Sequence, residues 1–224
     1  MSFWGQALEI ARVDLQVERR MGDVTRIVLP FSVVALLVFP LALGVDLSAI
    51  SRIGPAVFWA VGILFGMQVA LRQAANDSPE RRDLYSLLGV DPAARFAGRS
   101  LSGSVLTVGF LTALLIGMIA LYSPDLPEGW PAPMILGLLL TAVGLTELGT
   151  LAGEVTAGLR NRTALASLIV APMALPLVVG GSQTLESLAR GAVILPWILL
   201  LVATDLALAV LGVALARPLE EASR

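Results

Sequence analysis

Three acidic residues stand inside long hydrophobic stretches of this sequence: Glu147, Glu154 and Asp205. A charged side chain in the hydrocarbon region of a bilayer is costly, so such residues usually face protein or water and often carry function. Glu147 and Glu154 are seven residues apart and therefore share one face of a helix, with Thr146 and Thr150 close by. We take the three acids as candidate polar groups inside a membrane.

The three acids differ in the arginines available to them. Glu154 is predicted near the cytoplasmic end of its helix, where Arg160 or Arg162 would form an ion pair with it. Glu147 lies deeper, at a depth where no arginine is predicted, so a functional polar group and a contact between helices both remain open. Asp205 would either pair across a helix interface or be held protonated, and the sequence does not choose between them.

The chain lacks three residue types on which much protein chemistry depends. It contains no cysteine, no histidine and no lysine, because all 15 basic residues are arginine. These absences exclude disulfides and thiolate chemistry, and they remove the commonest general base and haem ligand. A P-loop also needs a lysine that reaches the phosphates of ATP. We therefore predict no catalytic residue and no metal site, and we expect any ATP hydrolysis to occur on another chain.

The composition indicates a membrane protein. Hydrophobic residues make up 57% of the chain, charged residues only 14%, and the mean hydropathy is +0.85. A helix needs about 20 mostly apolar residues to cross a bilayer. Six stretches qualify, and they fill a single all-α transmembrane domain over residues 1–224. The predicted spans are 27–44, 53–71, 101–122, 134–155, 164–181 and 192–216.

The arginines predict the orientation of these spans. Thirteen of the 15 fall before the first span, between spans 2 and 3, between spans 4 and 5, or after the last span. The connections on the opposite side hold only Arg52 and Arg190. Because cytoplasmic connections are enriched in basic residues, we expect both termini in the cytoplasm.

Residues 3–21 are amphipathic and do not look like a span. Phe3, Trp4, Leu8 and Leu15 fall on one broad apolar face, which Asp14 and Glu18 interrupt, and several arginines lie opposite. One interpretation is an elbow helix that lies flat on the inner leaflet. The other is an ordinary helix packed on the cytoplasmic ends of the spans. Trp4 and the arginines favour the elbow.

A short polar helix is predicted at residues 78–89, between spans 2 and 3. Ser78 can cap its first turn, Pro79 suits the first helical position, and Gly89 is a natural stop. Leu84, Leu87 and Leu88 form an apolar stripe. After the stop, Asp91 and Pro92 repeat the start signal and open a second helix that leads into span 3.

The short helix is the main candidate for an interaction site. It has little reason to be stable alone, so it needs a groove, either on a cytoplasmic partner or on its own bundle. In the first case leucines would anchor the helix and its charged residues would add complementarity. The candidate residues are Glu80, Arg81, Arg82, Asp83, Leu84, Tyr85, Leu87 and Leu88.

Four segments together resemble the CcmB family, the membrane subunit of the haem exporter of cytochrome c maturation. They are LLVFPLALGVD (36–46), IGPAVFWAVGILFGM (53–67), DLYSLLGVDPAARFAGRSL (83–101) and ELGTLAGEVTAGLRNRTALASLIVAPMALPLVVGGSQ (147–183). They follow the family order along most of the chain. The layout of an elbow helix and six spans is also similar to that of type-2 ABC exporters.

The resemblance implies a role and a set of partners. It implies a permease subunit in a bacterial inner membrane that works with a CcmA-like ABC ATPase and with small CcmC-like and CcmD-like haem-handling membrane proteins. ATP would bind the ATPase, haem would be at most a transient cargo, and the complex would free a haem-loaded chaperone. The exporter layout also implies a coupling role for residues 78–89, membrane lipid around the chain, and possible pairing with a second copy. Nucleic acid has no place in this role.

Three alternatives to this role remain, and the least favoured of them is an inert scaffold. A type-2 permease for another amphipathic cargo would have the same layout. An ion-coupled transporter would instead use Glu147 and Asp205 as proton sites, and it would have no need of a docking helix at residues 78–89.

Overall fold

The computed structural model of the chain describes residues 2–43, 47–75, 79–156 and 172–222. No strand occurs within these ranges. Helix α1 is followed by a short π-helical segment, η1, which continues directly into α2. The elements in chain order are α1 (Phe3–Met21), η1 (Val24–Val28), α2 (Leu29–Leu43), α3 (Leu47–Ala75), α4 (Pro79–Leu87), α5 (Pro92–Tyr122), α6 (Pro131–Val155), α8 (Leu175–Ala189) and α9 (Leu195–Ala222).

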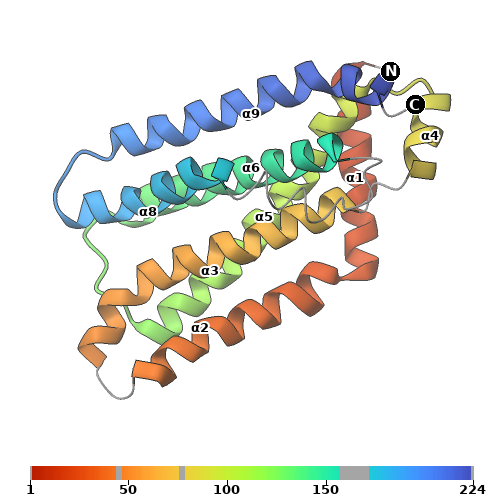
Figure 1. The fold of residues 1–224 in the computed structure, drawn as a ribbon. Coiled ribbons are helices and arrows are strands. Elements are labelled where there is room, and N and C mark those ends of the chain that lie inside the picture. The colour runs from red at the N-terminus through yellow and green to blue at the C-terminus, as the bar shows by residue number, and fades with distance from the viewer. Residues whose placement is uncertain (1, 44–46, 76–78, 157–171, 223–224) are drawn as a thin grey trace.

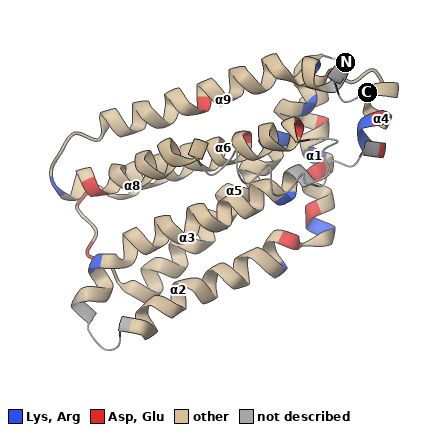
Figure 2. Ribbon diagram, in the orientation of Figure 1, with Lys and Arg blue, Asp and Glu red and all other residues tan. Residues whose placement is uncertain are grey.

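The long helices lie side by side in a bundle, and α1 crosses one end of it (Figure 1). Helices α5 and α6 are central: α5 contacts α1, α2, α3, α6 and α9, whereas α6 contacts α3, α5, α8 and α9. Phe58, Leu111, Leu114 and Leu145 are fully buried in the core that α3, α5 and α6 share. Most charged residues gather towards the ends of the bundle, most densely around α1 and α4 (Figure 2).

Among the residues that the structure describes, five helices are long and apolar enough to cross a membrane. They are Val24–Ala42, Ala49–Gln73, Pro92–Tyr122, Pro131–Val155 and Leu195–Leu219, and each contains most of one predicted span. The chain is therefore an integral membrane protein built from helices. The predicted orientation and the cytoplasmic location of the termini stay predictions.

The remaining predicted span, 164–181, stays a prediction. Residues 164–171 lie outside the described ranges, but α8 continues past Gly181 to Ala189. The polar residues Ser182, Gln183 and Glu186 end the hydrophobic run without ending the helix. Leu185 is 4% exposed and keeps this part of α8 packed in the core.

The local start and stop signals after α3 are confirmed. Helix α4 begins at Pro79, and Gly89 has a φ of 66°, in the left-handed region that favours glycine. Asp91 caps α5: its side chain accepts a hydrogen bond of 3.0 Å from the Ala93 N–H, and Pro92 occupies the first turn. The helix that begins there runs unbroken through the third span, as predicted. The capping role of Ser78 falls outside the described residues.

Helix α1 packs against α5 along one face, which contains Ala7, Ile10 and Ala11. Asp14 and Glu18 lie on this buried face, so the acids that interrupt the apolar pattern are internal polar contacts. Glu18 accepts a hydrogen bond of 2.7 Å from the Val24 N–H at the start of η1. Other apolar side chains of α1 are exposed, with Trp4 at 68%, Leu8 at 58% and Met21 at 57%. The packed interpretation therefore holds for one face, and the position of α1 on a membrane surface stays a prediction.

The close approach of α1 to α5 depends on Gly98. A Cβ atom at this position would lie 2.5 Å from the carbonyl oxygen of Ala7 and 2.9 Å from the Cβ of Ile10. Gly98→Ala is therefore expected to push α1 away and to lower the free energy of unfolding by about 1–3 kcal/mol. Thermal unfolding of the purified protein measures this.

Gly109→Ala is the matched control on the same helix. A Cβ atom there would meet nothing within 4 Å, so we expect a neutral effect or a stabilisation of up to about 1 kcal/mol from the higher helix propensity of alanine. Equal effects of the two substitutions would contradict the proposed packing of α1.

Candidate functional site

Helix α4 presents an apolar strip to its surroundings. Leu84 is 53% exposed, Leu87 is 86% exposed and Leu88, just after the helix, is 68% exposed. The helix projects beyond the end of the bundle beside α1 (Figure 1). A helix of nine residues gains little stability from its own hydrogen bonds, so its apolar face is expected to be stabilised by packing. The exposed leucines therefore mark a surface suited to a partner.

The charged residues of α4 have separate roles. Arg81 donates hydrogen bonds to the carboxylate of Asp14 on α1 and to the hydroxyl of Tyr85, at 3.0 and 3.2 Å. Partial burial tends to lower the pKa of Arg81, but the Asp14 carboxylate and Tyr85 outweigh it, and the pKa is raised. Glu80 and Asp83 are exposed and Arg82 is half-buried. Arg81 therefore holds α4 to α1, while the two acids face outward.

Asp14 extends this connection to α5. Its second carboxylate oxygen accepts a hydrogen bond of 3.4 Å from the hydroxyl of Ser102. A short polar chain thus runs from Arg81 on α4 through Asp14 on α1 to Ser102 on α5. The sequence did not predict this polar chain, because its three residues are far apart in the sequence. From the sequence, Asp14 is only a polar residue that interrupts the apolar face of α1.

A small apolar cavity of about 170 Å³ lies between α1 and the α4–α5 turn. Beside the cavity, the side-chain oxygen of Gln6 accepts a hydrogen bond of 3.1 Å from the Asp91 N–H. The residues lining the cavity are Gln6, Glu9, Ile10, Val13, Tyr85, Leu88 and Val90.

Asp91 joins a third helix to this end of the bundle. Its carboxylate accepts a hydrogen bond of 2.8 Å from Arg217, near the end of α9. The bond from Arg217 lowers the pKa of Asp91, the Ala93 N–H lowers it further, and burial opposes both. A carboxyl with a lowered folded-state pKa stabilises the fold above its unfolded pKa of about 3.9, and this contribution is lost as the pH falls through the folded value.

The end of α9 is therefore expected to separate from α5 in acid. Because the chain has no cysteine, spin labels on cysteines introduced at exposed positions of the two helix ends can report their distance. In the parent chain we expect the distance distribution to broaden below about pH 4. Asp91→Asn keeps a capping side chain but loses the charge, so its distribution should be broad already at neutral pH. A pH response that persists in this variant would assign the effect to another group.

Glu154 lies in a buried ionic cluster. Its carboxylate is 3.3 Å from Arg95 and 4.0 Å from Arg99, both on α5, and all three side chains are at most 7% exposed. Arg99 also donates a hydrogen bond of 2.7 Å to the backbone carbonyl of Gln73 on α3. The sequence predicted an ion pair for Glu154 with other arginines and did not identify these two partners. The predicted partners, Arg160 and Arg162, lie outside the described residues.

Glu147 and Asp205 are brought together at the interface of α6 and α9. They are 9% and 8% exposed, and their carboxyl groups interact electrostatically. Both oxygens of Asp205 and one oxygen of Glu147 are buried without a hydrogen-bond partner among the described residues. The sequence singled out both residues but gave no reason to place them together.

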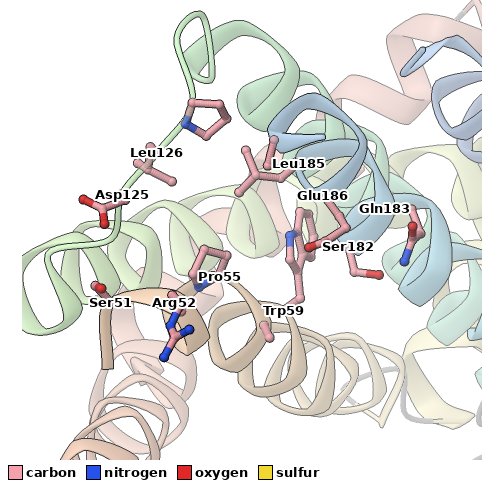
Figure 3. Close-up of a pocket in the computed structure, with 13 residues that line it drawn as sticks. Ser51, Arg52, Pro55, Trp59, Asp125, Leu126, Ser182, Gln183, Leu185 and Glu186 are labelled. Atoms are coloured by element: carbon pink, nitrogen blue, oxygen red, sulfur yellow. The ribbon is translucent and has the colours of Figure 1, made fainter. Parts of the chain in front are cut away.

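A second pocket lies at the other end of the bundle, between α3, the α5–α6 connection and α8 (Figure 3). It has a volume of about 330 Å³ and is lined by both polar and apolar side chains. Trp59 and Pro55 contribute apolar surface, whereas Arg52, Asp125 and Glu186 bring charges to its edge. Sequence reasoning did not anticipate this pocket.

The polar clusters contain no group of three or more acidic residues that could hold a metal ion within the described part of the chain. The site that the structure assembles best is instead a surface: α4, its attachment to α1, and the polar chain that continues into α5. Such an arrangement can bind a protein and transmit a displacement, because α1 packs along the helix that contacts most of the bundle.

Comparison with known proteins gives a consistent assignment. The family model described as CcmB protein matches residues 5–221. "Heme exporter protein B" of Haemophilus influenzae is 28% identical over 180 residues, covering 80% of this chain and 81% of the relative. The protein of the same name from Paracoccus denitrificans is 28% identical over 184 residues, with 80% and 82% covered. That of Pseudomonas aeruginosa is 26% identical over 196 residues, with 83% and 82% covered. The chain belongs to the CcmB family.

Proposed function

We propose that this chain is the membrane subunit of a haem export complex in a bacterial inner membrane and that α4 docks a separate ABC ATPase. The first part follows from the family and from relatives named as haem exporter protein B. The second part rests chiefly on one observation, the exposed strip formed by Leu84, Leu87 and Leu88. Leucines in an i, i+3, i+4 pattern are suited to a groove on a protein partner.

An ATPase is the proposed partner of α4 because the resemblance to type-2 ABC exporters implies one and because this chain offers no P-loop of its own. It contains no lysine, and a P-loop uses a lysine to hold the phosphates. Glu80 and Asp83 stay exposed beside the leucines and would meet basic residues of the partner. Complementary charges of this kind set the orientation of docking and speed association.

The attachment of α4 offers a route for coupling. A displacement of α4 would be passed to Asp14 through Arg81 and to α5 through both Ser102 and the packing at Gly98. Helix α5 contacts α2, α3, α6 and α9, so its movement would reach most of the membrane-spanning part. In this mechanism the ATPase supplies the energy and α1 transmits the movement.

Haem would contact this chain only transiently. The chain has neither histidine nor cysteine, so two of the usual strong ligands of haem iron are missing. CcmC-like and CcmD-like partners would bind haem more strongly. A haem-loaded chaperone would leave the complex when the spans rearrange. A second copy of this chain would complete a two-fold pore, because closed homo-oligomers are most often two-fold.

Purification from the native membrane in a mild detergent tests the proposed function. We expect an ABC ATPase and a small haem-handling membrane protein to copurify, and deletion of the gene to remove c-type cytochromes. Recovery of an ATPase without a haem-handling protein, together with normal cytochromes in the deletion strain, would point to another cargo. Recovery without any ATPase, under conditions where other ABC complexes survive, would contradict the docking role.

A further inference from the structure

Asp205 has a carboxyl group in the middle of a transmembrane helix, and none of the residues that the structure describes forms a hydrogen bond with it. Both of its oxygens are buried, and the residue is only 8% exposed. Glu147 on α6 is 9% exposed, and one of its oxygens also lacks a partner. Buried polar atoms are nearly always hydrogen-bonded, and acids at membrane depth usually mark a functional site. The two residues therefore need an explanation that packing alone does not give.

The geometry at Gly144 places Asp205 against α6, one helical turn from Glu147. The Oδ1 atom of Asp205 lies 2.5 Å from the position that a Cβ atom of Gly144 would occupy, so this carboxyl group lies directly against α6. Glu147 follows Gly144 by three residues, which is about one turn of the same helix. The two carboxyl groups are close enough to interact electrostatically. Gly144 thus provides the space that lets the Asp205 carboxyl group approach the turn of α6 that ends at Glu147.

No arginine of the described residues compensates the two acids. On α5, Arg95 and Arg99 contact Glu154, which is two turns and about 10 Å along α6 from Glu147. Helices α3, α8 and α9 also pack around the two acids. Their other described charged side chains lie nearer the helix ends. They are Arg52, Arg72, Glu186 and Arg217.

Two ionised carboxyl groups cannot coexist at this position. Each loses its hydration on burial, and like charges repel strongly where the dielectric constant is low. A proton held between two carboxyl groups removes one charge and supplies the missing hydrogen-bond donor. We propose that Glu147 and Asp205 form a proton-binding pair that holds one proton between them and keeps α6 and α9 together.

The pair links protonation to the packing of the bundle. While the proton is bound, one carboxyl group donates a hydrogen bond to the other across the interface of α6 and α9. When it leaves, the two negative charges repel each other and draw water between the helices. The site goes beyond the proposed ATPase docking and does not depend on it, since the two acids lie in a different part of the fold.

Infrared spectroscopy of the protein in lipid nanodiscs tests the bound proton directly. At neutral pH we expect the C=O stretching band of a protonated carboxyl group in the parent chain and its loss in the double variant Glu147→Gln/Asp205→Asn. These substitutions preserve size, so the bundle should still fold. Glu186→Gln is the control, because Glu186 is half exposed and paired with Arg190 at 2.6 Å; this variant should keep the band.

Reaction with dicyclohexylcarbodiimide identifies which acid holds the proton. The carboxyl oxygen bonds to the central carbon of the reagent while the acid proton moves to a nitrogen, giving an O-acylisourea that rearranges to a stable N-acylurea. We expect an adduct on the peptide of Glu147 or Asp205 at neutral pH and its loss as the pH rises. In Asp205→Asn the pH of half-labelling of Glu147 should fall by about one unit or more, because the neighbouring negative charge is gone.

Three results would overturn the proposal. One is a parent chain with neither the infrared band nor the adduct at neutral pH, which would mean that both acids are charged. Another is protection from the reagent by Na⁺ or Ca²⁺ at constant pH, which would assign the site to a metal cation. The third is an unchanged pH of half-labelling of Glu147 in Asp205→Asn, which would show that the two acids bind protons independently.

Discussion

Replacing Leu84 and Leu87 with aspartate is expected to abolish binding of the ATPase while the membrane-spanning bundle stays folded. The two side chains are 53% and 86% exposed, so the substitutions create no cavity and bury no charge in the isolated chain. In a docked complex, however, each aspartate would be forced into an apolar groove. Losing a central anchor of an interface costs about 2 kcal/mol or more, which corresponds to a more than tenfold weaker complex for each leucine.

Copurification and the ATPase activity of the purified complex measure this effect. Val193→Asp is the matched control, because Val193 is 72% exposed and belongs to the α8–α9 connection at the opposite end of the bundle. We expect the control to retain the ATPase and to support maturation of c-type cytochromes. If the leucine variant also retained the ATPase and full function, α4 would be a mere connector and the ion-coupled alternative would regain weight.

Glu154→Gln is expected to be the most destabilising of the conservative substitutions. The change removes the carboxylate that both Arg95 and Arg99 contact, and these guanidinium groups are 2% and 7% exposed. Loss of one partner from a buried ion pair typically costs about 3–5 kcal/mol, because the remaining charge has no water to solvate it. Chemical unfolding of the protein in detergent should show a loss of this size, with lower yield from cells.

The same substitution at an exposed ion pair provides the control. Glu186 is 2.6 Å from Arg190, but their side chains are 48% and 70% exposed. Water and salt screen such a pair, so Glu186→Gln should change the free energy of unfolding by less than about 1 kcal/mol. Comparable losses in the two variants would contradict the buried ionic cluster described for Glu154, because they would mean that this cluster is open to solvent.

The features that the sequence predicted best are helix starts and ends, which depend on residues close together in the chain. Pro79, Gly89, Asp91 and Pro92 fix the ends of α4 and the start of α5 through local backbone preferences, so their roles can be inferred without a structure. Hydrophobic length likewise located most of the spans. It did not indicate how far α8 extends, because the polar residues after Gly181 line a pocket on one side of a helix that remains packed on the other.

The contacts between distant residues could not be predicted in the same way. Two predicted spans separate Asp14 from Arg81 along the sequence. No local pattern indicates that α1 crosses the bundle beside α4. Glu154 had two arginines close in sequence, which concealed the arginines on α5 that contact it. Each of these acids was recognisable as unusual, but the identity of its partner depends on the tertiary fold.

Photo-crosslinking from position 87 in the native membrane tests the docking claim most directly. A photoreactive amino acid there replaces the most exposed leucine of α4, at 86% exposure, and reports what lies against it in the cell. We predict a covalent adduct with an ABC ATPase subunit, and none with that subunit from position 193. Adducts only with lipid or with this chain itself, at normal levels of the ATPase, would contradict the assignment of α4 as its docking helix.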